Sequence, residues 1–309
     1  MPQVKIFSGS ESQYLAEKIA AAYGTKLGDL TISRFSDGEI GVHYNESVRG
    51  AEVFIVLSTF PPADNLMELL LLVDAAKRAS AHKVIMVMPY FGYARQDRKD
   101  KPRVSIGAKV VANAIQSVGT DRLMTCDLHA GQIQGFFDIP VDHLDGSAIF
   151  VPYLRSLNLG SDLIFASPDV GGVVRTRAFA KNFGAEMVVC DKQRKRANEI
   201  ASMQVIGDVE GMDVVLVDDM VDTAGTITKA AELLTEKGAK SVRAIATHPV
   251  LSGPAYERIE NSVLKELVVS DTVPLKQECS KIKVLSFADL FARAINNVVT
   301  HESISSLFI

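Results

Sequence analysis

Residues 214–226, VVLVDDMVDTAGT, constrain the fold more than any other part of the sequence. The first four residues form a continuous apolar run, which is typical of a strand that is buried on both faces of a parallel sheet. Asp218 and Asp219 follow where such a strand would end, and residues 227–237 have the pattern of a helix. A strand, a tight loop and a helix in this order indicate an α/β fold.

The loop between that strand and that helix has the composition of a phosphate-binding loop. Residues 222–226 are mostly small or carry hydroxyl groups. A helix N-terminus behind such a loop presents free backbone N–H groups and a positive dipole end to an anion. Asp218 and Asp219 would repel a phosphate, but they can accept hydrogen bonds from vicinal sugar hydroxyls. We therefore predict a sugar-phosphate site, and the alternative is an acidic strand end as in nucleotide hydrolases or receiver domains.

Size, charge and cysteine content narrow the class of protein. A chain of 309 residues is long enough for two domains. The net charge of −4 provides no basic field for nucleic acid or a membrane surface. The three cysteines are too widely spaced for a zinc pattern, and we find no signal pattern or membrane-spanning apolar run. We expect a cytoplasmic protein with no nucleic-acid or membrane partner.

The chain repeats one structural plan. Apolar strands alternate with helices, which indicates βαβ units and a parallel sheet. Residues 119–129 and 238–248 share the spacing of a glycine, a strand and a histidine. We interpret the similarity as an internal duplication and predict two domains of one α/β fold, residues 1–147 and 148–309.

Two basic segments interrupt the alternation of strands and helices. Residues 91–103 (FGYARQDRKDKPR) and residues 191–196 (DKQRKR) each follow a predicted central strand. The first occupies the place that the small-residue loop has in the second half. A solvated loop is the alternative for both segments. The pattern predicts that one half keeps a sugar-phosphate loop while the other presents cationic side chains.

Six motifs in one order cover the whole chain. They are FSDGE (35–39), RQDRK (95–99), CDLHAGQIQGFFD (126–138), SPDVGG (167–172), DKQR (191–194) and DDMVDTAGT (218–226). Together they resemble the ribose-phosphate pyrophosphokinase family, in its phosphate-regulated bacterial form. The last motif alone fits many phosphoribosyltransferases, but FSDGE and RQDRK are not part of their pattern.

The resemblance implies both a fold and an activity. The fold is α/β, with two tandem type I phosphoribosyltransferase-like domains whose central parallel sheets are flanked by helices. The activity is Mg²⁺-dependent transfer of the diphosphoryl group of ATP to the 1-hydroxyl of ribose 5-phosphate. The products are AMP and 5-phosphoribosyl 1-diphosphate, which serves nucleotide biosynthesis. The resemblance also implies a homohexamer that phosphate and ADP regulate.

The resemblance assigns roles to individual residues. Lys192 and Arg194 match the catalytic loop, where cations meet the charge that builds up on non-bridging phosphate oxygens. The ATP-binding residues are Phe35, Asp37, Gly38, Glu39, Arg95, Gln96, Asp97 and Arg98. The residues for ribose 5-phosphate are Arg194, Asp218, Asp219, Asp222, Thr223, Ala224, Gly225 and Thr226. Mg²⁺ positions are His129 and Asp169, and Ser47 and Arg49 match part of a regulatory site at a subunit interface.

Some residues fit these roles less well. Histidine is an unusual ligand for Mg²⁺, and chemistry alone favours Asp127, with His129 as a buried hydrogen-bonding residue. Residues 100–105 differ from the sequence that many relatives have after RQDRK, and Ala224 stands where glycine is common. Neither difference removes a catalytic group.

Two other functions share parts of this pattern. A nucleobase phosphoribosyltransferase has the 218–226 loop but consumes the diphosphate product and needs no ATP-binding half. A non-catalytic regulatory subunit or a ligand-sensing repressor on the same fold tends to lose the catalytic cations. Because Lys192, Arg194 and His129 are all present, the sequence favours an enzyme.

Overall fold

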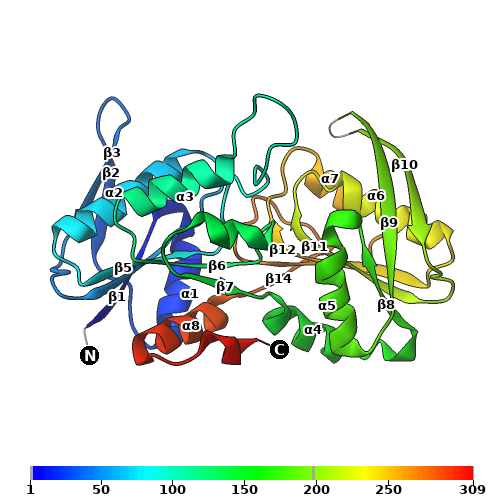
Figure 1. The fold of residues 1–309 in the computed structure, drawn as a ribbon. Coiled ribbons are helices and arrows are strands. Elements are labelled where there is room, and N and C mark those ends of the chain that lie inside the picture. Colours follow the sequence, from blue (N-terminus) through cyan, green and yellow to red (C-terminus); the bar gives the residue numbers. More distant parts are fainter. Residues whose placement is uncertain (1–2, 197–198, 309) are drawn as a thin grey trace. The chain divides into compact units, whose positions relative to one another are not determined.

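The computed structural model describes residues 3–196 and 199–308, and for residues 192–196 and 199–202 it describes the backbone alone. The chain divides into two compact units (Figure 1). Unit 1 comprises Met1–Asp145 together with Phe287–Phe308, and unit 2 comprises Gly146–Ser286. None of the helices within these described ranges is long and apolar enough to cross a membrane.

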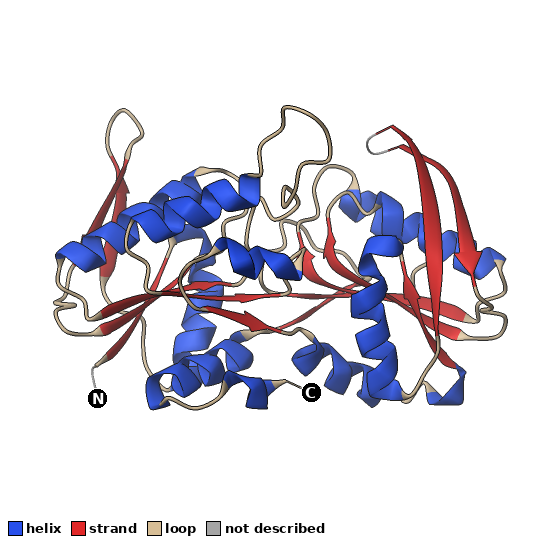
Figure 2. Cartoon of the chain, viewed as in Figure 1, coloured by secondary structure: helices blue, strands red, loops and turns tan. Residues whose placement is uncertain are grey.

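Unit 1 is built on a five-stranded parallel sheet with the order β1-β4-β5-β6-β7. The strands are β1 (Val4–Ser8), β4 (Glu52–Val56), β5 (Lys83–Met88), β6 (Arg122–Cys126) and β7 (Val141–Leu144). The helices are α1 (Gln13–Tyr23), α2 (Asp64–Arg78), α3 (Gly107–Ser117) and α8 (Ala288–Thr300), and Figure 2 shows α2 and α3 above the sheet. Parallel neighbours need crossover connections, and α2 and α3 are two of them.

The alternation of side chains along the central strands separates two cores in unit 1. Val53 and Ile55 of β4 belong to one apolar cluster with Leu69 and Leu72 of α2. Phe54 lies between them in the sequence and is also completely buried. Because successive side chains of a strand point to opposite faces, Phe54 faces the other side of the sheet. The apolar runs of the sequence therefore reflect strands that are covered on both faces.

A hairpin stands apart from the central sheet of unit 1. Strands β2 (Leu30–Arg34) and β3 (Ile40–Tyr44) form a two-stranded antiparallel sheet of their own, and Figure 1 shows it rising on the side of α2. Near its base the Tyr44 hydroxyl donates a hydrogen bond of 2.9 Å to the Leu72 carbonyl of α2. The Tyr44 ring also packs edge-on against Phe7. The hairpin is thus anchored at the end farthest from its turn.

Unit 2 is built on a seven-stranded sheet with the order β10-β9-β8-β11-β12-β13-β14, which is parallel except for β10. The strands are β8 (Leu163–Ser167), β9 (Met187–Arg196), β10 (Glu199–Ile206), β11 (Asp213–Val221), β12 (Ser241–Pro249), β13 (Leu267–Ser270) and β14 (Ile282–Leu285). The helices are α4 (Ser147–Ser156), α5 (Val173–Phe183), α6 (Gly225–Glu236) and α7 (Ala255–Glu260).

Both faces of the second sheet are covered as well. Ile164 and Ala166 of β8 share an apolar cluster with residues of α6 and α7. Phe165, between them, contacts the rings of Phe179 and Phe183 of α5, with centroid distances of 6.3 and 5.3 Å. The helices α6 and α7 therefore cover one face, and α5 covers the other.

Two features differ from the sequence predictions. Residues 191–196 were expected to form a loop, but they continue β9 and pair with β10, with Lys192 opposite Met203. Strands pair through backbone hydrogen bonds, which basic side chains do not prevent. The basic composition of this segment therefore gave no sign of the strand. The second domain was expected to include residues up to 309, yet Phe287–Phe308 belongs to unit 1. There α8 packs along α1 and buries Phe291 and Ile295.

The packing of α8 can be tested by removing a buried ring. Phe291→Ala should lower the free energy of unfolding of unit 1 by about 3–5 kcal/mol, because it leaves a cavity under α8. Hydrogen exchange should then increase in α1. Asn296→Ala, at an exposed position of α8, is the matched control and should be close to neutral. Faster exchange in the strands of unit 2, with α1 unchanged, would contradict the assignment of α8 to unit 1.

Candidate active site

Three carboxylates gather at the ends of two neighbouring strands of unit 2. Strands β8 and β11 are parallel and adjacent, with Leu216 opposite Ala166. The carboxyl ends of parallel neighbours lie at the same edge of a sheet, which brings Asp169 close to Asp218 and Asp219. Burial raises the pKa of Asp218 well above its usual value, and the charges of Asp219 and Asp169 raise the pKa further. The structure thus groups three predicted site residues.

An arginine balances part of this negative charge. Asp219 is buried, with 5% of its surface exposed, and its Oδ1 lies 3.2 Å from Nη1 of Arg175 on α5. The backbone N–H of Asp219 donates a hydrogen bond of 2.9 Å to Oδ1 of Asp218. The two adjacent aspartates therefore have different partners: Asp219 pairs with the guanidinium of Arg175, and Asp218 accepts a backbone N–H. The sequence prediction treated the two as equivalent.

The SPDVGG segment forms the turn that places Asp169 and Arg175. The Ser167 hydroxyl donates to the Asp169 carbonyl at 2.6 Å, and the Gly172 N–H donates to Oδ1 of Asp169 at 3.2 Å. A Cβ atom on Gly172 would lie 2.8 Å from the Ser167 hydroxyl oxygen. The glycine therefore permits α5 to begin directly against β8, which brings Arg175 within reach of β11.

The small-residue loop of unit 2 closes onto the start of α6. Helix α6 begins at Gly225, two residues earlier than predicted. Ala224 has a φ angle of +59°, in the left-handed region that favours glycine, and its carbonyl accepts bonds from the N–H and hydroxyl of Thr228. The N–H groups in the first turn of a helix have no intrahelical acceptor. The loop therefore has the backbone geometry that suits a phosphate.

A second arginine supports this loop from α7. Nη1 of Arg258 donates a hydrogen bond of 2.9 Å to the Thr223 carbonyl. A Cβ atom on Gly225 would lie 3.1 Å from the same nitrogen, which leaves little room for a side chain. The Ser252 hydroxyl also donates to the carboxylate of Asp222. These contacts hold residues 222–225 in one conformation.

The predicted ATP-binding residues lie in unit 1, on two projecting segments. One is the turn of the β2–β3 hairpin, which is closed by hydrogen bonds of 2.9 Å from Phe35 N to Glu39 O and from Gly38 N to Phe35 O. Gly38 has a φ angle of +96°, and the Asp37 carboxylate accepts the N–H of Glu39. The Phe35 ring is 62% exposed. An exposed aromatic ring on a rigid turn is suited to stack on a base.

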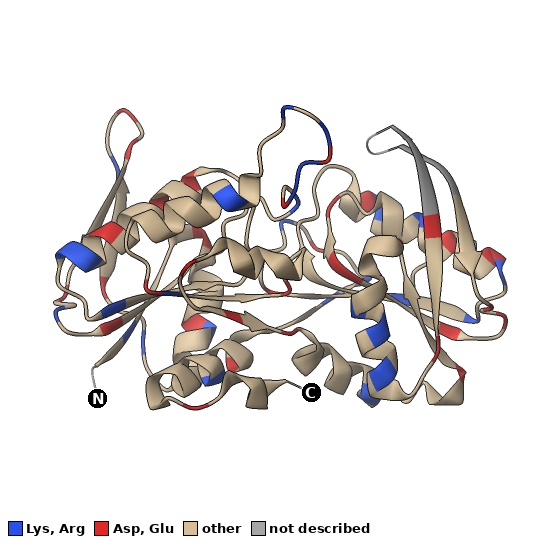
Figure 3. Ribbon diagram, in the orientation of Figure 1, with Lys and Arg blue, Asp and Glu red and all other residues tan. Residues whose placement is uncertain are grey.

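The other segment is the charged loop between β5 and α3, whose basic and acidic residues Figure 3 shows in blue and red. Arg95, Gln96 and Arg98 are exposed. The side-chain oxygen of Gln96 accepts a bond of 3.3 Å from the Ser105 hydroxyl, and a Cβ atom on Gly107 would lie 2.7 Å from it. Gln96 therefore rests against the start of α3 and fixes the loop there.

Asp97 has a partner on another part of unit 1. Its carboxylate accepts a hydrogen bond of 3.2 Å from Gln132, in the turn that follows β6. This contact links the RQDRK motif to the CDLHAGQIQGFFD motif. In the sequence, only the resemblance connected these two motifs. The charged loop is thus bound to its own unit through Gln96 and Asp97.

Comparison with known proteins identifies the family. Residues 4–119 match the N-terminal domain of ribose phosphate pyrophosphokinase, and residues 183–309 match the phosphoribosyl synthetase-associated domain. A ribose-phosphate pyrophosphokinase of Porphyromonas gingivalis is 58% identical over 303 residues, which cover 98% of this chain and 97% of the relative. One from Wolinella succinogenes is 57% identical over 306 residues and 99% of each chain. The chain belongs to the ribose-phosphate pyrophosphokinase family.

A solved structure agrees with this family assignment. The crystal structure of phosphoribosylpyrophosphate synthetase from Mycobacterium smegmatis matches with a TM-score of 0.92 and 37% identity, over 97% of this chain and 99% of that chain. The resemblance that the motifs indicated is therefore confirmed. The predicted α/β class with parallel sheets flanked by helices is confirmed too.

The residues predicted to bind Mg²⁺ belong to different units. His129 follows β6 in unit 1 and is exposed, so the alternative of a buried histidine, which chemistry alone favoured, is wrong. Asp127 is the buried residue of this segment, with 8% of its surface exposed and a φ angle of +39°. The N–H of Leu128 donates to Nε2 of His143 at 2.9 Å, which holds the segment in place. Across residues 3–196 and 199–308, no three His, Cys, Asp or Glu side chains form a metal-binding group.

The remaining predicted residues lie on a strand and on a surface loop. Lys192 and Arg194 lie on β9, with Met203 and Ile200 opposite them, and their side chains lie outside the described residues. Ser47 and Arg49 precede β4 in an exposed loop, where the Arg49 N–H donates to the Ser47 hydroxyl at 3.4 Å.

Arg175 and Arg258 were not among the predicted site residues. Arg175 lies on α5, directly after the SPDVGG motif, whereas Arg258 lies on α7, which follows β12, and neither is part of a recognised motif. A general signal was available for Arg175, because a carboxylate in an apolar strand end requires a cation nearby. No such signal pointed to Arg258, which contacts a backbone carbonyl.

The ion pair between Arg175 and Asp219 should contribute to stability. Arg175→Met leaves a buried carboxylate without its guanidinium, so the free energy of unfolding should fall by about 3 kcal/mol. Arg177→Met, at an exposed position of the same helix, is the control and should change it little. Urea unfolding measures both values. The double variant Arg175→Met with Asp219→Asn should recover part of the loss, and a loss equal to the sum of the single effects would contradict the pairing.

Proposed function

We propose that this protein transfers the diphosphoryl group of ATP to the 1-hydroxyl of ribose 5-phosphate. The observation that carries the proposal is the identity of 58% with a ribose-phosphate pyrophosphokinase over 98% of the chain. The 1-hydroxyl oxygen attacks the β-phosphorus of ATP and loses its proton. The bond from the β-phosphorus to the oxygen that bridges it to the α-phosphorus breaks. AMP leaves with that oxygen, and 5-phosphoribosyl 1-diphosphate forms for nucleotide synthesis.

Unit 2 supplies the site for the sugar phosphate. The 5-phosphate binds to the backbone N–H groups of the loop Asp222–Thr226 and to the positive end of α6. The hydroxyls of Thr223 and Thr226 add donors. Asp218 accepts hydrogen bonds from the ribose hydroxyls, while Asp219, paired with Arg175, holds the strand end in shape. Ala224, in the left-handed conformation, keeps the backbone close to the phosphate.

Unit 1 supplies the site for the nucleotide. Phe35 stacks on the base, and Asp37, Gly38 and Glu39 read its polar edge from a turn with internal hydrogen bonds. Arg95 and Arg98 meet the phosphates, and Gln96 and Asp97 hold their loop to the rest of the unit. Exposed arginines on an anchored loop can form charge-assisted, bidentate hydrogen bonds with a polyphosphate.

Lys192 and Arg194 provide the catalytic cations. Attack on the β-phosphorus adds negative charge to non-bridging oxygens, so fixed cations lower the barrier more than a covalent nucleophile would. Arginine offers a planar fork and lysine a compact charge. Arg194 also contacts ribose 5-phosphate. The support for these roles is the match of DKQR to the family pattern and the place of both residues on β9, which pairs with β8 through residues 187–189.

Mg²⁺ is the cofactor that suits these residues. Asp169 would supply an oxygen donor, and its negative charge is close enough to raise the pKa of Asp218, so a cation bound by Asp169 would be favourable there. His129 is the further candidate ligand. Mg²⁺ usually keeps several waters and binds substrate phosphates, and thus needs no complete protein cage. When bound, it neutralises the phosphate charge of ATP.

Assembly and regulation follow the family pattern in this proposal. We assign a homohexamer, with phosphate and ADP as regulators that bind near Ser47 and Arg49. The exposure of Arg49 leaves its guanidinium available to an anion. Cys126, Cys190 and Cys279 form no disulfide bond, which fits a reducing cytoplasm.

The reaction can be tested directly with purified protein. ATP and Mg²⁺ should yield AMP only when ribose 5-phosphate is present, and ADP should not form. A diphosphate-releasing reaction of 5-phosphoribosyl 1-diphosphate with a nucleobase would identify a phosphoribosyltransferase instead.

The role of Lys192 can be tested in the same assay. Lys192→Ala should lower kcat by about 100-fold with a modest change in KM, because the charge of Lys192 acts mainly in the transition state. An unchanged kcat in this variant would remove Lys192 from the mechanism.

A further inference from the structure

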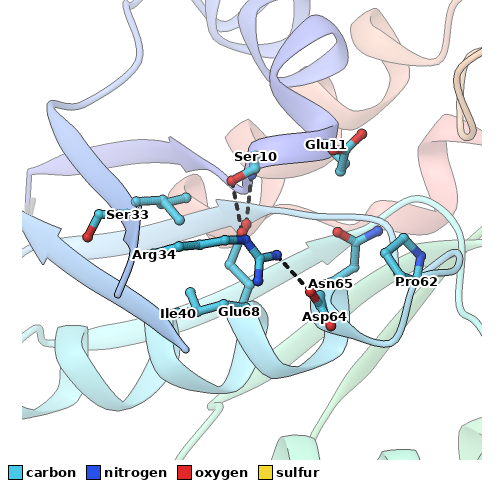
Figure 4. Close-up of a pocket in the computed structure, with 10 residues that line it drawn as sticks. Ser10, Glu11, Ser33, Arg34, Ile40, Pro62, Asp64, Asn65 and Glu68 are labelled. Carbon is cyan, nitrogen blue, oxygen red and sulfur yellow. Dashed lines mark hydrogen bonds and ion pairs between the residues drawn. The ribbon is translucent and has the colours of Figure 1, made fainter. Parts of the chain in front are cut away.

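A cavity separates the outer half of the β2–β3 hairpin from the body of unit 1. Its volume is about 200 Å³, and its walls include Ile32, Arg34 and Ile40 of the hairpin (Figure 4). The opposite wall is formed by Ser10 and by the first turns of α2, with Asp64 and Glu68. The hairpin therefore packs on the body at its base, through Tyr44, and bridges a gap nearer its turn.

Arg34 spans this gap with its two terminal nitrogens. Nη2 lies 2.7 Å from Oδ2 of Asp64, in the first turn of α2. Nη1 donates a hydrogen bond of 2.9 Å to the carbonyl of Gly38, within the turn that carries Phe35 and Glu39. One guanidinium thus connects the turn of the hairpin to a helix of the body. Lysine could not reproduce this contact, because it lacks the planar fork.

The floor of the cavity is fixed independently of Arg34. Glu68 is buried and accepts two hydrogen bonds from Ser10, of 2.7 Å from its N–H and 2.8 Å from its hydroxyl. Figure 4 shows these bonds beside the ion pair of Arg34 and Asp64. The oxygens of Glu68 already accept hydrogen bonds from Ser10. Arg34 pairs instead with the carboxylate of Asp64.

The ion pair of Arg34 and Asp64 is too exposed to contribute much to the stability of the fold. The side chains of Arg34 and Asp64 are 54% and 51% exposed, and such pairs contribute little to the free energy of unfolding. Its clear structural effect is on the place of the turn. Small displacements of a binding group cost much more in ligand affinity than in folding.

We propose that Arg34 is a positioning residue for the nucleotide, and that its bridge from Asp64 to Gly38 sets where Phe35 and Glu39 meet ATP. This inference rests on the proposed function, since it takes the turn 35–39 as part of the ATP site. It makes Asp64, which has no assigned role, a functional partner of Arg34. A weak bridge across a cavity fixes the turn without making the hairpin rigid.

Steady-state kinetics on four variants tests the bridge. Arg34→Met should raise KM for ATP about tenfold and leave kcat and KM for ribose 5-phosphate within about twofold. Asp64→Asn should raise KM for ATP in the same direction. The double variant should be no worse than Arg34→Met alone, because both changes break one bridge. Arg34→Lys should behave like Arg34→Met, since an ammonium group cannot hold both partners.

A second ion pair on α2 provides the matched control. Arg78 and Asp74 are equally close, at 2.7 Å, and also exposed, so Arg78→Met should leave KM for ATP unchanged. An effect of Arg34→Met with none of Asp64→Asn would mean direct contact with ATP and would overturn the positioning role. So would an unchanged KM in both. A wild-type protein that releases no AMP would refute the proposed function itself, which the variants do not decide.

Discussion

The site depends on the cost of burying carboxylates at the ends of two parallel strands. Strands β8 and β11 end at the same sheet edge, and there Asp169, Asp218 and Asp219 come together. Arg175 compensates Asp219 with an ion pair of 3.2 Å. The charges of Asp219 and Asp169 raise the pKa of Asp218, so a sugar hydroxyl or a cation beside Asp218 would be favourable. The loop and the N-terminus of α6 then supply the anion site next to it in sequence.

The two units divide the work of the proposed reaction. Unit 2 carries the sugar-phosphate loop on a rigid support, with Arg258 and Ser252 bound to residues of the loop itself. Unit 1 carries its nucleotide residues on projecting segments that side-chain contacts attach to the rest of the unit, such as Gln96 on the start of α3 and Arg34 on Asp64. Fixed positions for the sugar and for the nucleotide suit a reaction in which the 1-hydroxyl must meet one phosphorus of a flexible triphosphate.

The sequence predicted the parts of this site that depend on local pattern. The apolar run before Asp218, the small residues after Asp222 and the order of the motifs all have direct structural counterparts. The prediction of a loop at the basic segment 191–196 was wrong. Its pairing with the antiparallel strand β10 uses backbone groups, which the pattern of side chains does not reveal. Helix α8 was placed with the wrong unit, since an amphipathic pattern does not say which core it covers. Arg175 and Arg34 act through pairs distant in sequence, which no spacing rule reveals.

The most direct test of the account is calorimetric titration of Asp218→Asn with ribose 5-phosphate and with its 2-deoxy analogue, Mg²⁺ present throughout. The change removes charge but keeps shape, and a lost hydrogen bond from a sugar hydroxyl to a carboxylate costs about 1.5–3 kcal/mol. We predict that affinity for ribose 5-phosphate falls about 10- to 100-fold, and that affinity for the analogue falls much less. Equal weakening of both sugars would contradict the hydroxyl contact and leave Asp218 as a residue that acts through the metal.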